Sequence, residues 1–266
     1  MEIALITEAS VVQIDFSSPT TALFWRYWRE TRGRFAAALV LLAALVSYAV
    51  ASSPSFLARY NTRFPDKPLA YSAYVWSGLF HYALQGLWIL GAFVLTLGGL
   101  SRETASGAGL FTLGLPMKKA HVFLVRACIT CLEAIVLGVL PAVLISVSSG
   151  LVGQTYPLSQ ALFFGGVMGV AGLVVVTFGL LLSEIFTGEF TAAVVGLCLL
   201  SVVFLSYKAH TLKGWNVFEV MSATASIDPI SQLSNWSVPW LGLTACCGAS
   251  AVLLWVTCQL VKRREA

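Results

Sequence analysis

Long stretches without charged side chains constrain the fold of this chain most. Several windows of about 20 residues are nearly uncharged, which is the length a helix needs to cross the hydrocarbon core of a bilayer. Of the 266 residues, 58% are hydrophobic and 11% are charged, whereas a soluble domain has about 25% charged residues. Water therefore cannot solvate most of the chain, and the sequence predicts a polytopic membrane protein.

The apolar windows predict six membrane spans. Backbone amides in lipid must be paired within their own segment, so each span is expected to be an α-helix. The alternating segments of about ten residues that build β-barrels are absent. The predicted fold class is all-α, with a single transmembrane domain over 1–266 whose six-helix part covers 35–261, between tails at 1–34 and 262–266. The predicted spans are Phe35–Ser52, Trp76–Leu100, His121–Ser146, Gln160–Leu182, Phe190–Tyr207 and Pro239–Val261.

The basic residues predict which ends of the spans face the cytoplasm. One side has eleven of them and the other has five. The more basic side is normally cytoplasmic, so both termini and the loop after the second span are expected inside. The net charge of +4 comes from these flanks and does not indicate a nucleic-acid partner. The eleven are Arg26, Arg29, Arg32, Arg34, Arg102, Lys118, Lys119, Arg126, Lys262, Arg263 and Arg264, and the five are Arg59, Arg63, Lys67, Lys208 and Lys213.

The segment before the first span predicts an amphipathic helix in the headgroup layer. Its aromatic residues fall near one face and its arginines mostly elsewhere, a pattern typical of interfacial helices. Ser18 and Pro19 match an N-cap and a first helical turn. The alternative is a basic flank that only sets the topology. The residues before Ser18 lack the basic start of a signal peptide, so we expect a retained cytoplasmic tail.

Few polar or small side chains stand out inside the spans. Ala161, Gly165 and Gly169 are spaced four residues apart and predict a close helix contact, within the chain or with a partner.

Glu133 would cost roughly 2.5–3.5 kcal/mol if it faced lipid, so it is expected either to line a substrate path or to fix helix packing. Arg126 lies two turns away, about 10 Å along the axis, too far for a simple direct pair.

Catalytic and metal-binding patterns are absent from the sequence. It contains no G-x-x-x-x-G-K-[ST], H-E-x-x-H or G-x-S-x-G motif. The six cysteines all fall within the predicted spans and are interpreted as packing residues. His81 is interpreted as an interfacial or packing residue. We therefore expect no catalytic residue and no cofactor or metal bound by this chain.

The loop between the second and third spans is the most informative polar segment. It reads RETASGAGLFTLGLPMKKAHVF and has too few apolar residues to cross a membrane. Such a stretch suits a short surface helix that buries one face against a partner or headgroups. Glu103, Gly107, the Leu115–Pro116 pair and Lys118 or Lys119 resemble the first cytoplasmic loop of type 2 ATP-binding cassette (ABC) permeases. The apolar side chains of that helix are Leu110, Phe111, Leu113 and Leu115.

The resemblance covers most of the chain, although two positions depart from the family pattern. The family usually has Thr where this chain has Ala108, and Ser or Thr before an Arg where this chain has two lysines. The resemblance implies six spans, cytoplasmic termini, a coupling loop that docks on a separate ATPase subunit, and a second contact in SEIFTGEF at Glu184 and Glu189. It further implies that the chain works with a second permease subunit and that ATP and Mg²⁺ bind only to the ATPase. It also implies that the transporter is an exporter in a bacterial inner membrane.

Two other functions are compatible with the residues. A proton- or ion-coupled secondary transporter would use Glu133 as its proton site, and a membrane scaffold would bind a protein without moving a solute. A separate prediction concerns the external segment before the last span. Its aromatic residues favour the interface, so we expect short helices that cap the path; these residues are Trp215, Phe218, Trp236 and Trp240.

Overall fold

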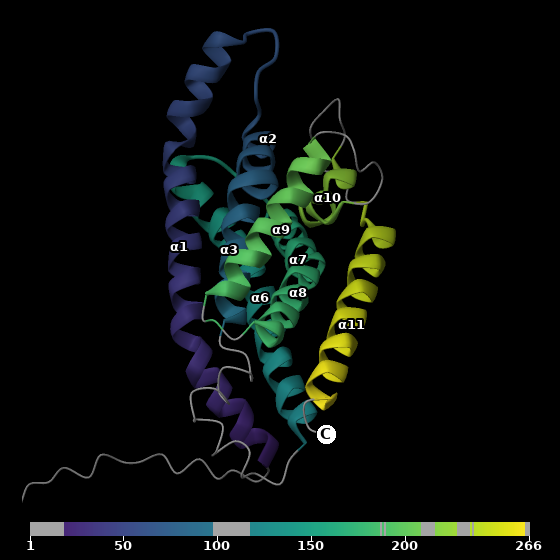
Figure 1. The fold of residues 1–266 in the computed structure, drawn as a ribbon. Helices are drawn as coiled ribbons and strands as arrows, with labels where there is room; N and C mark the ends of the chain where they lie inside the picture. Colours follow the sequence, from purple (N-terminus) through teal and green to yellow (C-terminus); the bar gives the residue numbers. More distant parts are fainter. Residues whose placement is uncertain are drawn as a thin grey trace, which may run out of the picture.

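The chain folds into a bundle of apolar helices (Figure 1). The computed structural model describes residues 19–97, 118–186, 188, 190–208, 216–227, 235 and 237–263. The elements in chain order are α1 (Pro19–Arg63), α2 (Tyr71–Tyr74), the π-helix η1 (Val75–Ala83), α3 (Leu84–Thr96), α6 (Lys119–Ser149), the 3-10 turn η2 (Gly150–Val152), α7 (Leu158–Ala171), α8 (Leu173–Ile185), α9 (Thr191–Lys208), α10 (Val217–Met221), the 3-10 turn η3 (Thr224–Ser226) and α11 (Trp240–Arg263).

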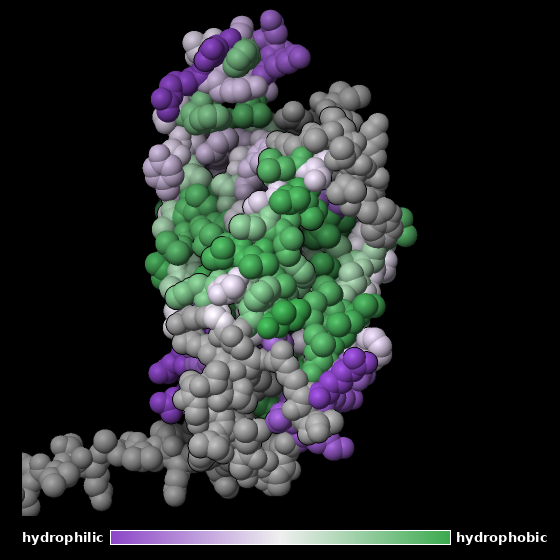
Figure 2. All heavy atoms as spheres, in the orientation of Figure 1, coloured by the Kyte–Doolittle hydropathy of each residue, from purple (hydrophilic) through white to green (hydrophobic). Residues whose placement is uncertain are grey.

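The helices have the length and apolar composition expected of a multi-pass membrane protein. Among the residues that the structure describes, five helical segments are long and apolar enough to cross a membrane, and α9 is a shorter apolar helix. Figure 2 shows apolar residues across the middle of the visible face, with hydrophilic residues gathered towards both ends. The predicted all-α membrane class is therefore confirmed.

The first helix differs from its prediction at both ends. An interfacial helix at 19–34 and a loop from residue 53 were expected, but α1 is one helix of 45 residues. At 1.5 Å per residue it is about 68 Å long, more than twice the hydrocarbon thickness of about 30 Å. Near its start, Leu23 and Tyr27 pack against Val122 and Ile129 of α6. This face is therefore used for helix packing.

The far end of α1 continues through a proline. Pro54 lacks the N–H that would bond the Val50 carbonyl, and the hydroxyl of Ser53 donates to that carbonyl at 2.7 Å instead. The rings of Phe56 and Tyr60 then stack at 6.2 Å, one turn apart. These contacts extend the helix to Arg63, and the connection to α2 is short. The remaining predicted boundaries that can be compared lie within five residues of the observed ones.

Aromatic side chains of α3 fill gaps left by glycines in the middle of the bundle. A Cβ added at Gly172 would lie 2.2 Å from the Trp88 ring, and one at Gly196 would lie 2.3 Å from the Phe93 ring. The indole of Trp88 also donates to the Ala134 carbonyl of α6 at 3.0 Å. Gly172 is the residue at which α7 ends and α8 begins, so the fourth span is interrupted where the Trp88 ring enters.

The predicted small-residue contact of the fourth span is observed, and its partner is α6 of the same chain. A Cβ added at Gly165 would lie 2.6 Å from the Ala142 Cβ and 2.7 Å from the Gly138 carbonyl oxygen. A Cβ at Gly169 would lie 3.1 Å from the Ile135 Cα. By contrast, α11 lies at the edge of the bundle (Figure 1), and its Trp240 and Trp255 side chains are exposed.

Candidate functional site

The structure describes the two ends of the predicted coupling loop. Leu97 follows α3, and Lys118 is exposed and immediately precedes Lys119, the first residue of α6. The predicted contact residues Glu103, Gly107, Leu110, Phe111, Leu113, Leu115 and Pro116 lie outside the described residues, as does Glu189.

Glu184, one of the two residues of the second predicted contact, lies at the end of α8. It belongs to the last turn of α8, and its side chain is 4% exposed. The apolar sequence of α8 continues through Ile185, so the helix includes this carboxylate instead of ending before it. Glu184 is therefore a buried helical residue next to the predicted contact loop, and the contact itself stays a prediction.

A group of polar residues lies where α3 ends; we call Thr31, Arg34, Leu97, Arg126 and Glu133 the inner cluster. The Leu97 carbonyl accepts a hydrogen bond from Arg34 Nη1 at 2.5 Å and another from Arg126 Nη2 at 2.9 Å. Carbonyls at a helix C-terminus lack intrahelical partners and attract cations. Two helices, α1 and α6, thus bond the end of α3 at the point where the predicted coupling loop begins.

Glu133 occupies the deeper part of the inner cluster. It is 3% exposed, and its Oε1 accepts a hydrogen bond from the Thr31 hydroxyl at 2.5 Å. This bond joins α6 to α1. Glu133 is not among the residues that line the two larger pockets described below. The geometry therefore favours the packing interpretation of this residue.

Sequence reasoning missed the roles of Arg34 and Arg126. Both were interpreted as part of the basic flank that sets topology, yet Arg126 is 3% exposed. A signal was present, because Arg126 and Glu133 are seven residues apart and so lie on one helix face. Two charged residues on one face of an apolar span indicate a polar cluster between helices.

At the opposite end of the bundle, the segment that was predicted to be external is bonded to η1 and α3. Trp76 Nε1 donates to the Ser222 carbonyl at 2.9 Å, and Gln85 Nε2 donates to the Phe218 carbonyl at 2.8 Å. His81 Nδ1 lies 3.1 Å from the Ser222 hydroxyl. Short helices were expected here, and the described residues 216–227 contain two, α10 and η3, with Phe218 buried. Trp215 and Trp236 lie outside the described residues.

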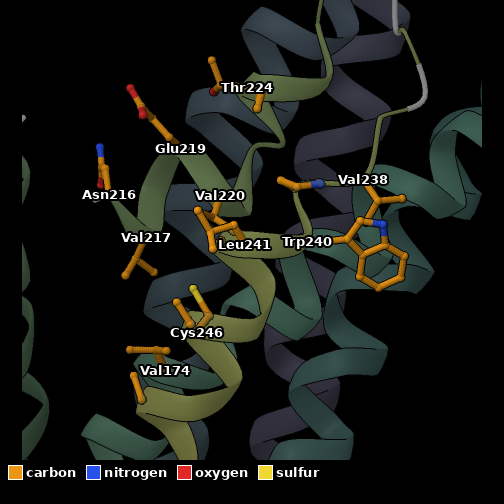
Figure 3. Close-up of a pocket in the computed structure, with 15 residues that line it drawn as sticks. Val174, Asn216, Val217, Glu219, Val220, Thr224, Val238, Trp240, Leu241 and Cys246 are labelled. Atoms are coloured by element: carbon orange, nitrogen blue, oxygen red, sulfur yellow. The ribbon is translucent and has the colours of Figure 1, made fainter. Parts of the chain in front are cut away.

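A pocket of about 760 Å³ opens between α10 and α11 (Figure 3). Its apolar lining includes Val220 and Leu241, which lie at the centre of the view, while Glu219 and Thr224 lie towards the outer end. A smaller pocket of about 420 Å³ lies beside α9 and includes His81 and Phe204 in its walls. Apolar walls with a polar rim suit an amphipathic molecule.

The structure agrees only in part with the interpretation of the cysteines and His81 as packing residues. Within the described residues, no three His, Cys, Asp or Glu side chains lie close enough to hold a metal ion. His81 packs between the rings of Trp76 and Tyr82, at 5.3 and 4.4 Å, as a packing residue would. Among the cysteines, Cys246 is buried but Cys128 is exposed, so core packing accounts for the first and not the second.

No protein-family model and no curated protein matches this chain. The functional assignment therefore depends on the residues and geometry described above.

Proposed function

We propose that this chain is the transmembrane permease subunit of an ABC transporter of the exporter type. It forms the translocation path together with a second permease subunit, identical or related, and docks a separate ATPase subunit through the loop between α3 and α6. ATP and Mg²⁺ bind on that ATPase, and this chain supplies no catalytic residue. The proposed location is a bacterial inner membrane, with both termini in the cytoplasm.

Two features support this proposal. The first is the loop sequence, in which Glu103, Gly107, Leu115–Pro116 and the two lysines match the coupling-loop pattern. The second is the architecture, an apolar helix bundle whose segment between α9 and α11 contains short helices. Neither the proton-coupled nor the scaffold alternative accounts for the loop pattern.

The shared Leu97 carbonyl is the observation that carries the proposed mechanism. Both guanidinium groups bond this atom, and hydrogen bonds to charged groups contribute about 1.5–3 kcal/mol each. A displacement of the docking loop would therefore act on α3 together with α1 and α6, rather than on α3 alone. Such joint movement of helices is compatible with the rigid-body rocking by which many transporters alternate access.

Purification of the tagged chain from its native membranes tests the proposal. We expect a P-loop ATPase to co-purify with the wild type, identified by mass spectrometry. Phe111→Asp should abolish that association, because burying an apolar side chain such as Phe111 contributes about 1.5–3 kcal/mol. Glu103→Ala should weaken it less, since an exposed ion pair contributes only about 0–1 kcal/mol.

A matched control is available at the other end of the molecule. Leu151 of η2 is 87% exposed, so Leu151→Asp introduces the same charge at an exposed apolar site far from the loop in sequence and should leave the ATPase bound. Membrane insertion of both variants is checked by fractionation. Absence of any P-loop ATPase from the wild-type preparation would reject the proposal in favour of the scaffold or secondary-transporter alternatives.

A further inference from the structure

A shallow groove runs along the lipid-facing side of α1 and α3, next to the inner cluster. Ala37 and Leu41 form one wall, and Leu90 and Val94 form the other. Gly91 and Ala38 meet at its floor, where a Cβ added to the glycine would lie 3.4 Å from the Ala38 Cβ. Leu41 is 55% exposed and Leu90 is 44% exposed. The groove is therefore open to the hydrocarbon region of a membrane.

Arg34 also lines this groove, and both arginines of the inner cluster bond a carbonyl rather than a carboxylate. The guanidinium groups of Arg34 and Arg126 both bond one uncharged carbonyl, that of Leu97. Each guanidinium has five N–H donors, and Arg126 Nη1 is buried without a hydrogen-bond partner. Among the residues that the structure describes, neither arginine forms an ion pair with a carboxylate. Two cations held this close together favour an anion.

We propose that this groove binds an anionic phospholipid of the leaflet on the side of the chain termini. Its phosphate accepts hydrogen bonds from Arg34, with the charge of Arg126 behind it, and its acyl chain follows Ala37, Leu41 and Leu90. Arginine matches a phosphate in a bidentate geometry. The seven residues from Arg34 to Leu41 rise about 10 Å, so the groove leads from headgroup depth into the hydrocarbon.

The apolar groove selects a lipid over a free phosphate ion, which the arginines alone would also attract. The proposal does not depend on the ABC assignment, because lipid binding is measured without an ATPase. It also differs from general attraction of anionic lipids to a basic flank, because it requires one particular arginine and one particular groove.

The test is native mass spectrometry of the purified full-length chain, released from detergent containing phosphatidylglycerol or phosphatidylcholine. We expect the wild type to prefer phosphatidylglycerol by about tenfold, and Arg34→Gln to reduce that preference to about threefold or less. The matched control is Arg32→Gln, the same charge change at an exposed position of α1, which should leave the preference unchanged. Ala37→Phe keeps every charge but fills the groove, and should lower lipid retention as Arg34→Gln does.

Several outcomes would overturn the site. Equal losses for Arg34→Gln and Arg32→Gln would show diffuse attraction by the basic flank. Undiminished lipid retention in Ala37→Phe would show that no acyl chain occupies the groove. Displacement of the lipid by excess inorganic phosphate would identify a phosphate site instead. Stronger lipid binding in Glu103→Gln would show that this carboxylate of the chain, and not a lipid, is the resident partner of the arginines.

Discussion

The two ends of the bundle are held together by different interactions. At the inner cluster, two guanidinium groups share the Leu97 carbonyl and the Glu133 carboxylate bonds Thr31. At the opposite end, two bonds between uncharged groups join the helices: the Tyr71 hydroxyl lies 2.7 Å from that of Ser149, and the Tyr74 hydroxyl donates to the Ala49 carbonyl at 3.0 Å. Charge-assisted hydrogen bonds are shorter than neutral ones and roughly twice as strong.

Tyr156 strengthens this contrast. Burial, and to a smaller extent the neighbouring Tyr71, raises the pKa of the Tyr156 hydroxyl, so this group also stays neutral at the outer end. The comparison indicates that charged groups hold the end next to the predicted docking loop, whereas hydrogen bonds from uncharged side chains hold residues 216–227 at the opposite end. Between them, the glycines of α6 and α7 keep the helix axes close.

Separating the helices in the middle should disrupt both ends and have the largest effect. Gly165→Ala places a Cβ 2.7 Å from the Gly138 carbonyl oxygen, so α6 and α7 must move apart. Overpacking of this kind costs about 2–3 kcal/mol. We expect a lower thermal unfolding temperature of the detergent-solubilised protein, followed by fluorescence-detected size exclusion.

The next residue supplies the control for that variant. A Cβ added at Gly166 meets nothing within 4 Å, so Gly166→Ala should leave stability unchanged or raise it by up to about 1 kcal/mol through helix propensity. Equal destabilisation by the two alanines would mean that the close α6–α7 contact does not form.

Much of this framework could be predicted from the sequence, because hydrophobicity and helix length are local properties. The apolar windows located the helices, and the spacing of Ala161, Gly165 and Gly169 indicated the tight contact, although not its partner. Where α1 continues past Pro54, the Ser53 hydroxyl bonds the Val50 carbonyl that the proline leaves without a partner. A hydropathy average contains no information about such a bond.

The candidate site was less predictable than the fold. Arg34 and Arg126 acquire their role only when α1 and α6 meet at the end of α3, and this meeting depends on tertiary packing. Similarly, Trp76 and Gln85 find carbonyl partners more than 100 residues away in sequence, at separations of 146 and 133. At Glu184, the helix extends three residues past the predicted span end at Leu182 and so includes this carboxylate, which hydropathy alone placed after the span.

At the inner end, Glu133 distinguishes a packing role from a proton site. Glu133→Ala removes the bond to Thr31 and should cost about 1–2 kcal/mol, the range for polar bonds between membrane helices in model peptides. Glu133→Gln keeps an oxygen that can accept from Thr31, so stability and transport should be retained. The measurements are thermal unfolding and substrate flux in proteoliposomes. Loss of flux in a stable Glu133→Gln variant would support the proton-coupled alternative.

The outer end should show the smallest effect. Trp76→Phe removes the indole N–H that donates to the Ser222 carbonyl at 2.9 Å but keeps an aromatic ring at that position. A neutral hydrogen bond of this kind contributes about 0.5–1 kcal/mol. The loss should be local, because Gln85 still bonds the Phe218 carbonyl. Hydrogen exchange should therefore rise in residues 216–227 while exchange within α6 and α7 stays unchanged. If Trp76→Phe lowered global stability more than Glu133→Ala does, the comparison between the two ends would be wrong. The neutral contacts at the outer end would then be stronger than the charged inner cluster.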